Sequence, residues 1–324
     1  MPVLTAGVVL PDHYTVRPPE PTDAKALFEL LSDYNTSVIG FADCRLDEVA
    51  DCLVEPGFDR AADGWLVLDA GNGGPAGYGT AFAKGDWQVI ELEVTAQDPA
   101  VADWLIKRTL RRAGEMGRER GHAEVTVDCC IFGADEPMRA LLSDHDFTVG
   151  TTYHRMRIDH AGDVAAPDVP EGVVVRRGTF DDASRWAAHE AIIDSFQGQF
   201  GFVARPHDEW VEALDARVGF DWSDITVLEV DGRAVAVRVC SDMFVEGEDC
   251  GYIGTLGVVE EFRGRGLARF LLRDAFARDA AAGLAGTILN VDTNNPTPAL
   301  GLYLSVGMKP TLVFEGWRRI LPIA

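Results

Sequence analysis

The sequence has few cysteines, no metal-binding pattern and no long apolar run, and each absence excludes a class of protein. Its six cysteines are scattered over 324 residues without a C-x-x-C pair, so we exclude a disulfide scaffold and expect a reducing cytoplasm. The seven histidines include no pair at metal-ligand spacing, so no metal site is expected. Neither an apolar run of about 18 residues nor a secretory signal occurs, so no membrane association is predicted.

Positive charge is also scarce. The 29 Lys and Arg residues face 52 Asp and Glu residues, which gives a formal net charge of −23. Because binding to phosphate requires clustered cations, nucleic acid and anionic membranes are not expected partners. A cationic small molecule fits this charge better, although acidity also serves solubility alone. An anionic cofactor would need a local concentration of positive charge.

The length favours two domains, and the chain repeats itself. The segments 15–24 and 174–183 each have the pattern of a short strand ending near an arginine, an acidic helix cap and the start of an amphipathic helix. Further along, Asp128 is matched with Asp292, and Leu142 with Tyr303. Two copies of one α/β unit are therefore predicted, in residues 1–160 and 173–324, with a Pro- and Gly-containing linker at 161–172.

Each copy is expected to run strand, helix, helix, strands, helix, strand, helix, strand. In the second copy the predicted strands are 173–177, 225–229, 234–240, 252–259, 287–292 and 312–314, and the predicted helices are 183–194, 208–216, 267–281 and 297–306.

The most informative segment opens the predicted helix 267–281. It has the sequence Arg263-Gly-Arg-Gly-Leu-Ala268 and follows a strand. A glycine-rich turn at the positive end of a helix points several backbone N–H groups one way, which makes a cradle for phosphate. Arginines at 263, 265, 269 and 273 add positive charge. The dinucleotide pattern G-x-G-x-x-G fails because Arg269 stands at its third glycine, so another anionic cofactor is expected.

With Arg263, Gly266 and Ala268, the segment resembles the R-x-x-G-x-A loop that binds the acetyl-CoA pyrophosphate in the GNAT superfamily of N-acetyltransferases. The preceding Leu256-Gly-Val258 is similar to the family's L-x-V motif, and the segment 295–308 resembles its N-P-T-x-A-L-x-L-Y segment. The resemblance covers most of residues 170–324. It implies an α/β (α+β) fold of two tandem GNAT domains, each a mixed, mostly antiparallel sheet flanked by helices. The tandem form resembles the mycothiol synthase type, but Tyr252 stands where those enzymes carry a glutamate.

The resemblance implies an acetyl-CoA-dependent N-acetyltransferase, without a metal, that moves an acetyl group directly to a primary amine in a ternary complex. The acceptor would be a small molecule or a peptide. The Val258 backbone would hold the thioester oxygen, and Tyr303 would protonate or hydrogen-bond the leaving thiolate. The implied cofactor-binding residues are Leu256, Gly257, Val258, Arg263, Gly264, Arg265, Gly266, Leu267, Ala268, Asn295 and Tyr303.

The general base and the acceptor are left open. The candidate carboxylates for the base are Asp292, Asp242, Glu246, Glu248, Glu190 and Asp194. Its match with Asp128 favours a structural role for Asp292. The helices 183–194 and 208–216 and the loop 195–202 are predicted to wall the acceptor cleft, with Gln197, Gln199, His189, His207 and Trp210 as candidate lining residues. Nearby acids favour a cationic amine.

The first copy departs from the family pattern. Its residues 96–104 contain no glycine, and Asp98 and Asp103 stand where a phosphate would lie. Leu142 replaces the tyrosine. We therefore expect a degenerate half that kept the fold, with only 173–324 active, in a monomer or homodimer. The alternative is a non-catalytic acyl-CoA-binding or protein-interaction module.

Overall fold

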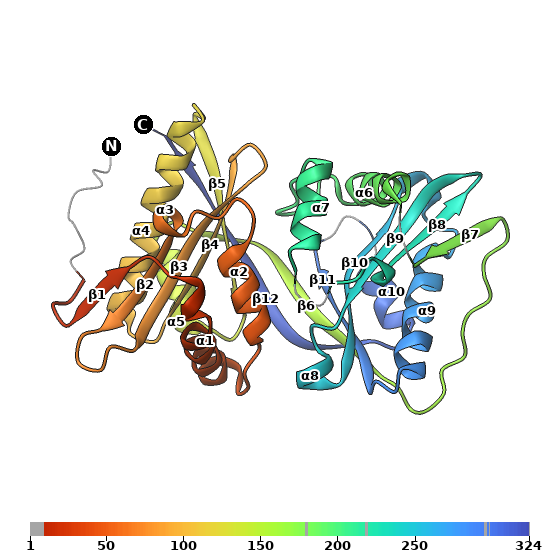
Figure 1. Ribbon diagram of the computed structural model, residues 1–324, viewed down its shortest axis with the longest axis horizontal. Coiled ribbons are helices and arrows are strands. Elements are labelled where there is room, and N and C mark those ends of the chain that lie inside the picture. The colour runs from red at the N-terminus through yellow and green to blue at the C-terminus, as the bar shows by residue number, and fades with distance from the viewer. Residues whose placement is uncertain (1–9, 179–180, 218–219, 295–296, 298, 324) are drawn as a thin grey trace. The chain divides into compact units, whose positions relative to one another are not determined.

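The computed structural model describes residues 10–178, 181–217, 220–294, 297 and 299–323 (Figure 1). It divides into two compact units, Met1–Gly150 with Glu315–Ala324, and Thr151–Phe314. Both units are mixed α/β structures with mostly antiparallel sheets flanked by helices, as the sequence predicts. Among the described residues, no helix is long and apolar enough to cross a membrane.

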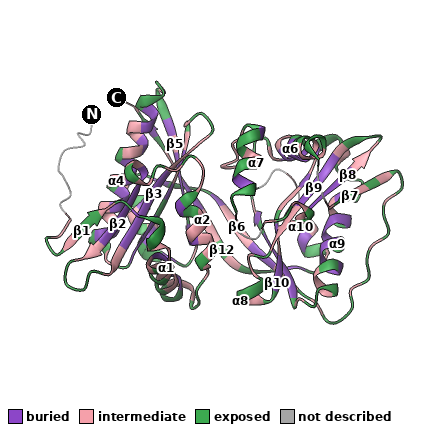
Figure 2. Cartoon of the chain, in the orientation of Figure 1, coloured by how far each residue is buried: buried purple, intermediate pink, exposed green. Residues whose placement is uncertain are grey.

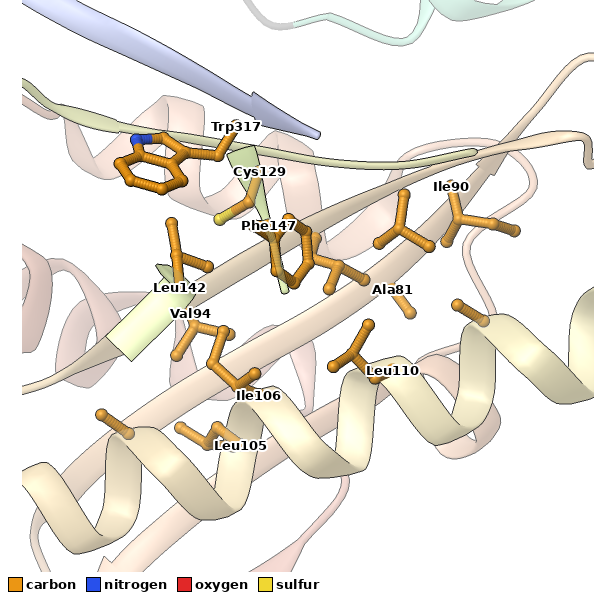
Figure 3. Packing of buried hydrophobic residues seen from close by; sticks show 14 of the residues in the cluster. Ala81, Ile90, Val94, Leu105, Ile106, Leu110, Cys129, Leu142, Phe147 and Trp317 are labelled. Carbon is orange, nitrogen blue, oxygen red and sulfur yellow. The ribbon is translucent and has the colours of Figure 1, made fainter. Parts of the chain in front are cut away.

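The first unit carries its sheet in the order β1, β2, β3, β4, β5 and the end of β12. These strands are β1 (Tyr14–Arg17), β2 (Gly64–Asp69), β3 (Pro75–Lys84), β4 (Val89–Ala96), β5 (Glu124–Phe132) and β12 (Lys309–Pro322). The helices are α1 (Ala24–Ile39), α2 (Leu46–Val54), α3 (Arg60–Asp63), α4 (Pro99–Glu119) and α5 (Glu136–Asp144). The apolar face of α4, with Leu105, Ile106 and Leu110, packs on Ala81 and Val94 of the sheet (Figure 3).

The second unit repeats this order from its other edge, with β7, β8, β9, β10, β11 and β6. The strands are β6 (Thr148–Asp159), β7 (Val173–Arg177), β8 (Ile225–Val230), β9 (Arg233–Ser241), β10 (Cys250–Val258) and β11 (Gly286–Asp292). The helices are α6 (Asp182–Phe196), α7 (His207–Asp215), α8 (Val245–Glu248), α9 (Leu267–Ala281) and α10 (Ala299–Ser305). Figure 2 shows buried residues concentrated on the strands of each unit, whereas α1 and α7 present exposed residues.

The last strand of each repeat contributes to the other unit. Residues 153–159 of β6 pair antiparallel with β11 of the second unit. The end of β12 lies in the first unit, where Trp317 packs in the core that contains Cys129 and Leu142 (Figure 3). The compact units therefore differ from the sequence copies 1–160 and 173–324, because sequence copies follow chain order whereas compact units follow packing.

Most predicted bounds in the second copy lie within two residues of the structure, and the strand 173–177 and the helix 267–281 agree at both ends. The strand predicted at 312–314 is too short, because β12 spans 14 residues. The short helix α8 is not predicted from the sequence. Residues 160–172, which contain the predicted linker, form no helix or strand.

Candidate active site

The site begins where two parallel strands separate. In the second unit β10 and β11 are paired from Cys250 opposite Gly286 to Ile253 opposite Leu289. The parallel pairing ends there, although β10 continues to Val258 and β11 to Asp292. A cavity of about 540 Å³ follows the separated ends and is lined by both strands, by the turn before α9 and by α10. A wedge between strands can hold an extended ligand against exposed backbone groups.

One end of the cavity is a helix N-terminus without a side-chain cap. Gly264 and Gly266 have φ angles of 77° and 80°, a left-handed conformation that glycine adopts at little cost. Gly266 is the N-cap of α9, and no described side chain caps this helix. The N–H groups of the first turn are therefore available, and the helix dipole favours an anion there. Gly264, Gly266, Leu267 and Ala268 line the cavity, so this end suits a phosphate.

The four arginines of this segment divide into two kinds. Arg263 and Arg269 line the cavity. The guanidinium of Arg263 donates to the carbonyl oxygens of Val258 and Ser195, at 3.1 and 3.4 Å, and that of Arg269 donates to the Ser305 hydroxyl at 3.0 Å. Arg265 instead lies over the Phe262 ring, 4.7 Å from its centroid. Neither Arg265 nor Arg273 belongs to the cavity lining, so the structure brings two of the four to the site.

The cavity wall also includes Tyr303. This residue of α10 is 7% exposed and lines the cavity with Leu289 and Leu302. Burial raises the pKa of the Tyr303 phenol to about 12. The phenol is therefore neutral at physiological pH and can act as a hydrogen-bond donor. Of the neighbouring predicted residues, Asn295 lies outside the described part of the chain, whereas Thr297 lines the cavity.

Asp292 is the one candidate base that lines this cavity. It ends β11 and accepts hydrogen bonds on Oδ1 from the Thr151 hydroxyl and, at 2.8 Å, from the Asn294 backbone N–H. Both bonds use one oxygen and fix the orientation of the carboxylate. Glu248 is paired with Arg157 at 2.7 Å, and Asp194 lies 3.7 Å from Arg233. The structure does not place these two, or Glu190, Asp242 and Glu246, on the cavity wall.

The predicted acceptor wall is formed only in part. Ser195, Phe196 and Gln199 line the cavity, whereas Gln197 does not. His189 and His207 are buried between α6 and α7, with their Nδ1 atoms 3.4 Å apart. Trp210 stacks on His189, with ring centroids 4.8 Å apart. These three aromatic residues hold α6 and α7 together and do not line the cavity.

Tyr153 and Asn290 line the cavity, although the sequence analysis names neither of them. Asn290 is two residues before Asp292 on β11, so strand alternation places both side chains on one face. That signal was available in the sequence. Tyr153 belongs to β6, which precedes the linker, and pairs with Asp292 across the sheet. No local pattern connects Tyr153 with the second copy.

The first unit replaces the anion site with its own carboxylates. Asp98 is the N-cap of α4, and its side chain accepts from the Ala100 backbone N–H and from the Tyr14 hydroxyl, each at 2.8 Å. The hydrogen bond from Tyr14 lowers the pKa of Asp98, which keeps the carboxylate ionised. Asp103 is bound by Lys107 at 2.6 Å and by His145 at 2.8 Å. Negative charge therefore occupies the position where the second unit leaves N–H groups available.

Strand registers correct one match between the copies. We take Val16 of β1 and Val175 of β7 as equivalent, as in the sequence match, and follow the paired residues from strand to strand across each sheet. This makes Leu92 of β4 equivalent to Ile253 of β10, and Cys129 of β5 equivalent to Leu289 of β11. Asp128 then corresponds to Ile288, so its predicted match with Asp292 is wrong. The sequence match failed because short alternating strands slide easily against each other, whereas hydrogen bonding fixes the register. Asp128 instead binds Arg318 through two contacts of 2.7 Å, and it gives no support to a structural role for Asp292.

The comparisons with known proteins agree with this geometry. Residues 189–308, which contain the loop and Tyr303, match the model of the acetyltransferase (GNAT) family. No curated protein matches the chain. A GCN5-related N-acetyltransferase from Sphaerobacter thermophilus is 23% identical, covers 97% of this chain and 98% of its own, and superposes with a TM-score of 0.77.

Two further solved structures show the same fold over the whole chain. A tandem GNAT protein from the clavulanic acid biosynthesis pathway is 14% identical, with 95% of this chain and 98% of its own covered and a TM-score of 0.68. The N-myristoyltransferase of Saccharomyces cerevisiae, with bound myristoyl-CoA, is 12% identical, with 97% and 85% covered and a TM-score of 0.64. Residues 189–308, in the second unit, thus match the GNAT family, and the chain as a whole shares its fold with the tandem GNAT protein.

Proposed function

We propose that the second unit transfers an acetyl group from acetyl-CoA to a primary amine of a small molecule or peptide. The transfer is direct and takes place in a ternary complex. The observation that carries this proposal is one cavity of about 540 Å³ whose wall includes an uncapped, glycine-bounded helix N-terminus together with Tyr303 and Asp292.

The donor half of the site supplies hydrogen bonds and charge. The first turn of α9 and Arg263 bind the pyrophosphate of acetyl-CoA. The separated part of β10 offers backbone groups to the arm of the donor, and the Val258 N–H stabilises the oxygen of the thioester as it gains negative charge. Residues 256–258 line the cavity, which supports this assignment.

Tyr303 stabilises the leaving thiolate by hydrogen bonding. Its pKa of about 12 lies well above the ordinary thiol pKa of about 8.5, so a full proton transfer costs about 5 kcal/mol. A neutral phenol can donate a hydrogen bond to the thiolate without that cost. The buried position of Tyr303 beside Leu302 excludes water that would compete for this bond.

Asp292 accepts a proton from the acceptor amine. An alkylamine with a pKa near 10.4 is neutral in only about one molecule in 10³ at pH 7, so attack on the thioester needs a group that removes a proton. Asp292 is the carboxylate at the cavity wall, and its charge also favours a cationic acceptor. Thr151 and Asn294 orient it through one oxygen.

The first unit is structural and binds no acetyl-CoA. Its α4 is capped by Asp98, and Leu142 stands in the position of Tyr303. The cysteines support a reducing compartment such as the cytoplasm, because all six are free thiols. A monomer or a homodimer fits the proposal equally.

The test uses the full chain, acetyl-CoA and a panel of primary amines, with release of the CoA thiol as the readout. We expect turnover with at least one cationic amine and one CoA bound per chain by calorimetry. Tight CoA binding without turnover on any amine would favour a non-catalytic acyl-CoA-binding module. Two CoA molecules per chain would contradict the structural role of the first unit.

A further inference from the structure

Ser195 carries a buried hydroxyl that has no hydrogen-bond partner among the described residues. The residue lies in the last turn of α6 and is 4% exposed. An unsatisfied buried hydroxyl is unfavourable by about 1–3 kcal/mol, and native proteins contain few of them. The position of Ser195 therefore calls for a partner.

The hydroxyls of Ser305 and Thr109, which also lie in helices, bond to backbone carbonyl groups of the preceding turn. Ser305 donates to the Leu302 carbonyl at 2.7 Å, and Thr109 lies 3.0 Å from the carbonyls of Leu105 and Ile106. This bond to the preceding turn is the ordinary solution for serine and threonine in a helix. The Ser195 hydroxyl does not make it, although the preceding turn is equally close along the chain.

The side chain of Ser195 instead lies against Gly257 of β10. A Cβ atom added to Gly257 would lie 2.7 Å from Ser195 Cβ and 2.8 Å from its Oγ. Glycine at 257 thus allows the end of α6 to approach β10 at this point. The equivalent residue in the first unit is Thr95, which has a side chain and leaves no such space.

The backbone of Ser195 is held in this position. Its carbonyl accepts from Arg263 at 3.4 Å and from the Gln199 side chain at 3.3 Å. Ser195, Gly257 and Arg263 all line the cavity. The hydroxyl therefore lies beside the end of β10, at a residue that lines the cavity.

We infer that the Ser195 hydroxyl donates a hydrogen bond to an amide carbonyl of the pantetheine arm of the acyl-CoA donor. This inference rests on the proposed function. The arm is an extended chain with two amides, so it presents carbonyl oxygens along a strand that it follows. A donor supplied by α6 complements the backbone groups of β10 from the other side of the arm.

The test compares Ser195→Ala with Ser184→Ala, which makes the same change on the same helix away from the cavity. Calorimetry measures the affinity of the full chain for CoA and for adenosine 3′,5′-bisphosphate, which lacks the arm. We expect Ser195→Ala to weaken CoA binding by about 3- to 12-fold, the range for one hydrogen bond, and to leave the bisphosphate unchanged. Ser184→Ala should change neither.

Thermal unfolding without ligand separates binding from folding. Because Ser195→Ala removes an unsatisfied hydroxyl, the free protein should unfold at the same or a higher temperature. CoA affinity within twofold of the wild type would overturn the inference and leave the proposed function intact. A lower unfolding temperature with equal weakening of both ligands would assign Ser195 a purely structural role. Failure of the wild-type protein to bind CoA would remove both proposals.

Discussion

Tyr303 and Leu142 occupy equivalent positions in the last turns of α10 and α5, where the backbone carbonyl of each accepts the same kind of hydrogen bond. The Met308 N–H donates to the Tyr303 carbonyl at 3.1 Å, and the Phe147 N–H donates to the Leu142 carbonyl at 3.0 Å. Both side chains are buried. The two units therefore share this helix end, and one of them lacks the phenol hydroxyl.

Removal of that hydroxyl tests its role. Tyr303→Phe should lower kcat by about 10- to 10⁴-fold with little change in acetyl-CoA affinity, because the hydroxyl acts on the leaving thiolate. Since the pKa of Tyr303 is raised to about 12, the wild-type rate should not fall through ionisation of this phenol below about pH 10. Steady-state rates from pH 7 to 10 measure both effects. Tyr14→Phe, in the first unit, is the control, and an unaltered kcat in Tyr303→Phe would exclude the phenol from the mechanism.

The carboxylate at the end of β11 is tested by an isosteric change. Asp292→Asn keeps an oxygen that accepts from Thr151 and Asn294 but loses the ability to take up a proton. We expect kcat to fall by about 10²- to 10⁴-fold at neutral pH. A CoA Kd and an unfolding temperature equal to those of the wild type would show that the loss is chemical. Wild-type turnover in this variant would assign the base elsewhere.

The loop glycines support a paired prediction. Gly266→Ala should destabilise the protein by about 1–2 kcal/mol and weaken CoA binding, because Gly266 has a φ of 80° although there is open space around it. Gly301 lies inside α10, where an added Cβ also meets nothing within 4 Å. Gly301→Ala should stabilise the protein by about 0.5–1 kcal/mol. Denaturant unfolding measures both, and equal shifts in the two variants would contradict the role of the left-handed turn.

The buried histidine pair predicts a loss of stability in acid. Burial, and then the neighbouring His207, lower the pKa of His189 below its ordinary 6.5. The folded state thus favours neutral His189, so this contribution is present above pH 6.5 and is lost as the pH falls through the lowered value. Urea unfolding at pH 7.5, 6.5 and 5.5 should show this decline. His189→Gln should flatten it, and a slope that this variant leaves unchanged would assign the pH dependence to other groups.

The buried pair of Arg238 and Asp274 ties α9 to the sheet. The Arg238 side chain is 2% exposed and contacts Asp274 at 2.9 Å, while Arg177 contacts the other oxygen at 2.5 Å. Asp274→Ala leaves a buried charge unpaired and should destabilise the protein by about 3–5 kcal/mol. Glu229→Ala breaks the exposed pair with Arg176 and should change stability by less than about 1 kcal/mol. Denaturant unfolding compares them, and similar losses would contradict this account.

The cavity wall formed by β10 and the turn before α9 was predictable because contiguous segments form it. Residues 256–258 and 263–268 follow one another on a strand and a turn, and the structure places most of them on one cavity wall. The acceptor side was not predictable in the same way. Tyr153 reaches the cavity by pairing with β11, a strand far along the chain, and no local pattern indicates that pairing.

The errors share one physical cause. Asp128 was matched with Asp292 because both close an alternating strand, yet the hydrogen-bond register displaces them by four positions. His189 and His207 are candidate cleft residues because of their helices, but in the structure they contact each other between α6 and α7. Local periodicity shows that an element forms, whereas its partner and its rotation depend on packing that a sequence pattern does not record.

The exchanged ends of β6 and β12 have a consequence for how the two copies can be separated. A fragment that begins after residue 160 would lose the strand that pairs with β11 from Gly286 to Asp292, and β11 would become a bare edge that includes Asp292. The remaining half would lose Trp317 and Leu321 from its core. After this exchange, no single cut in the linker releases two intact proteins, so each copy depends on the other to complete its sheet.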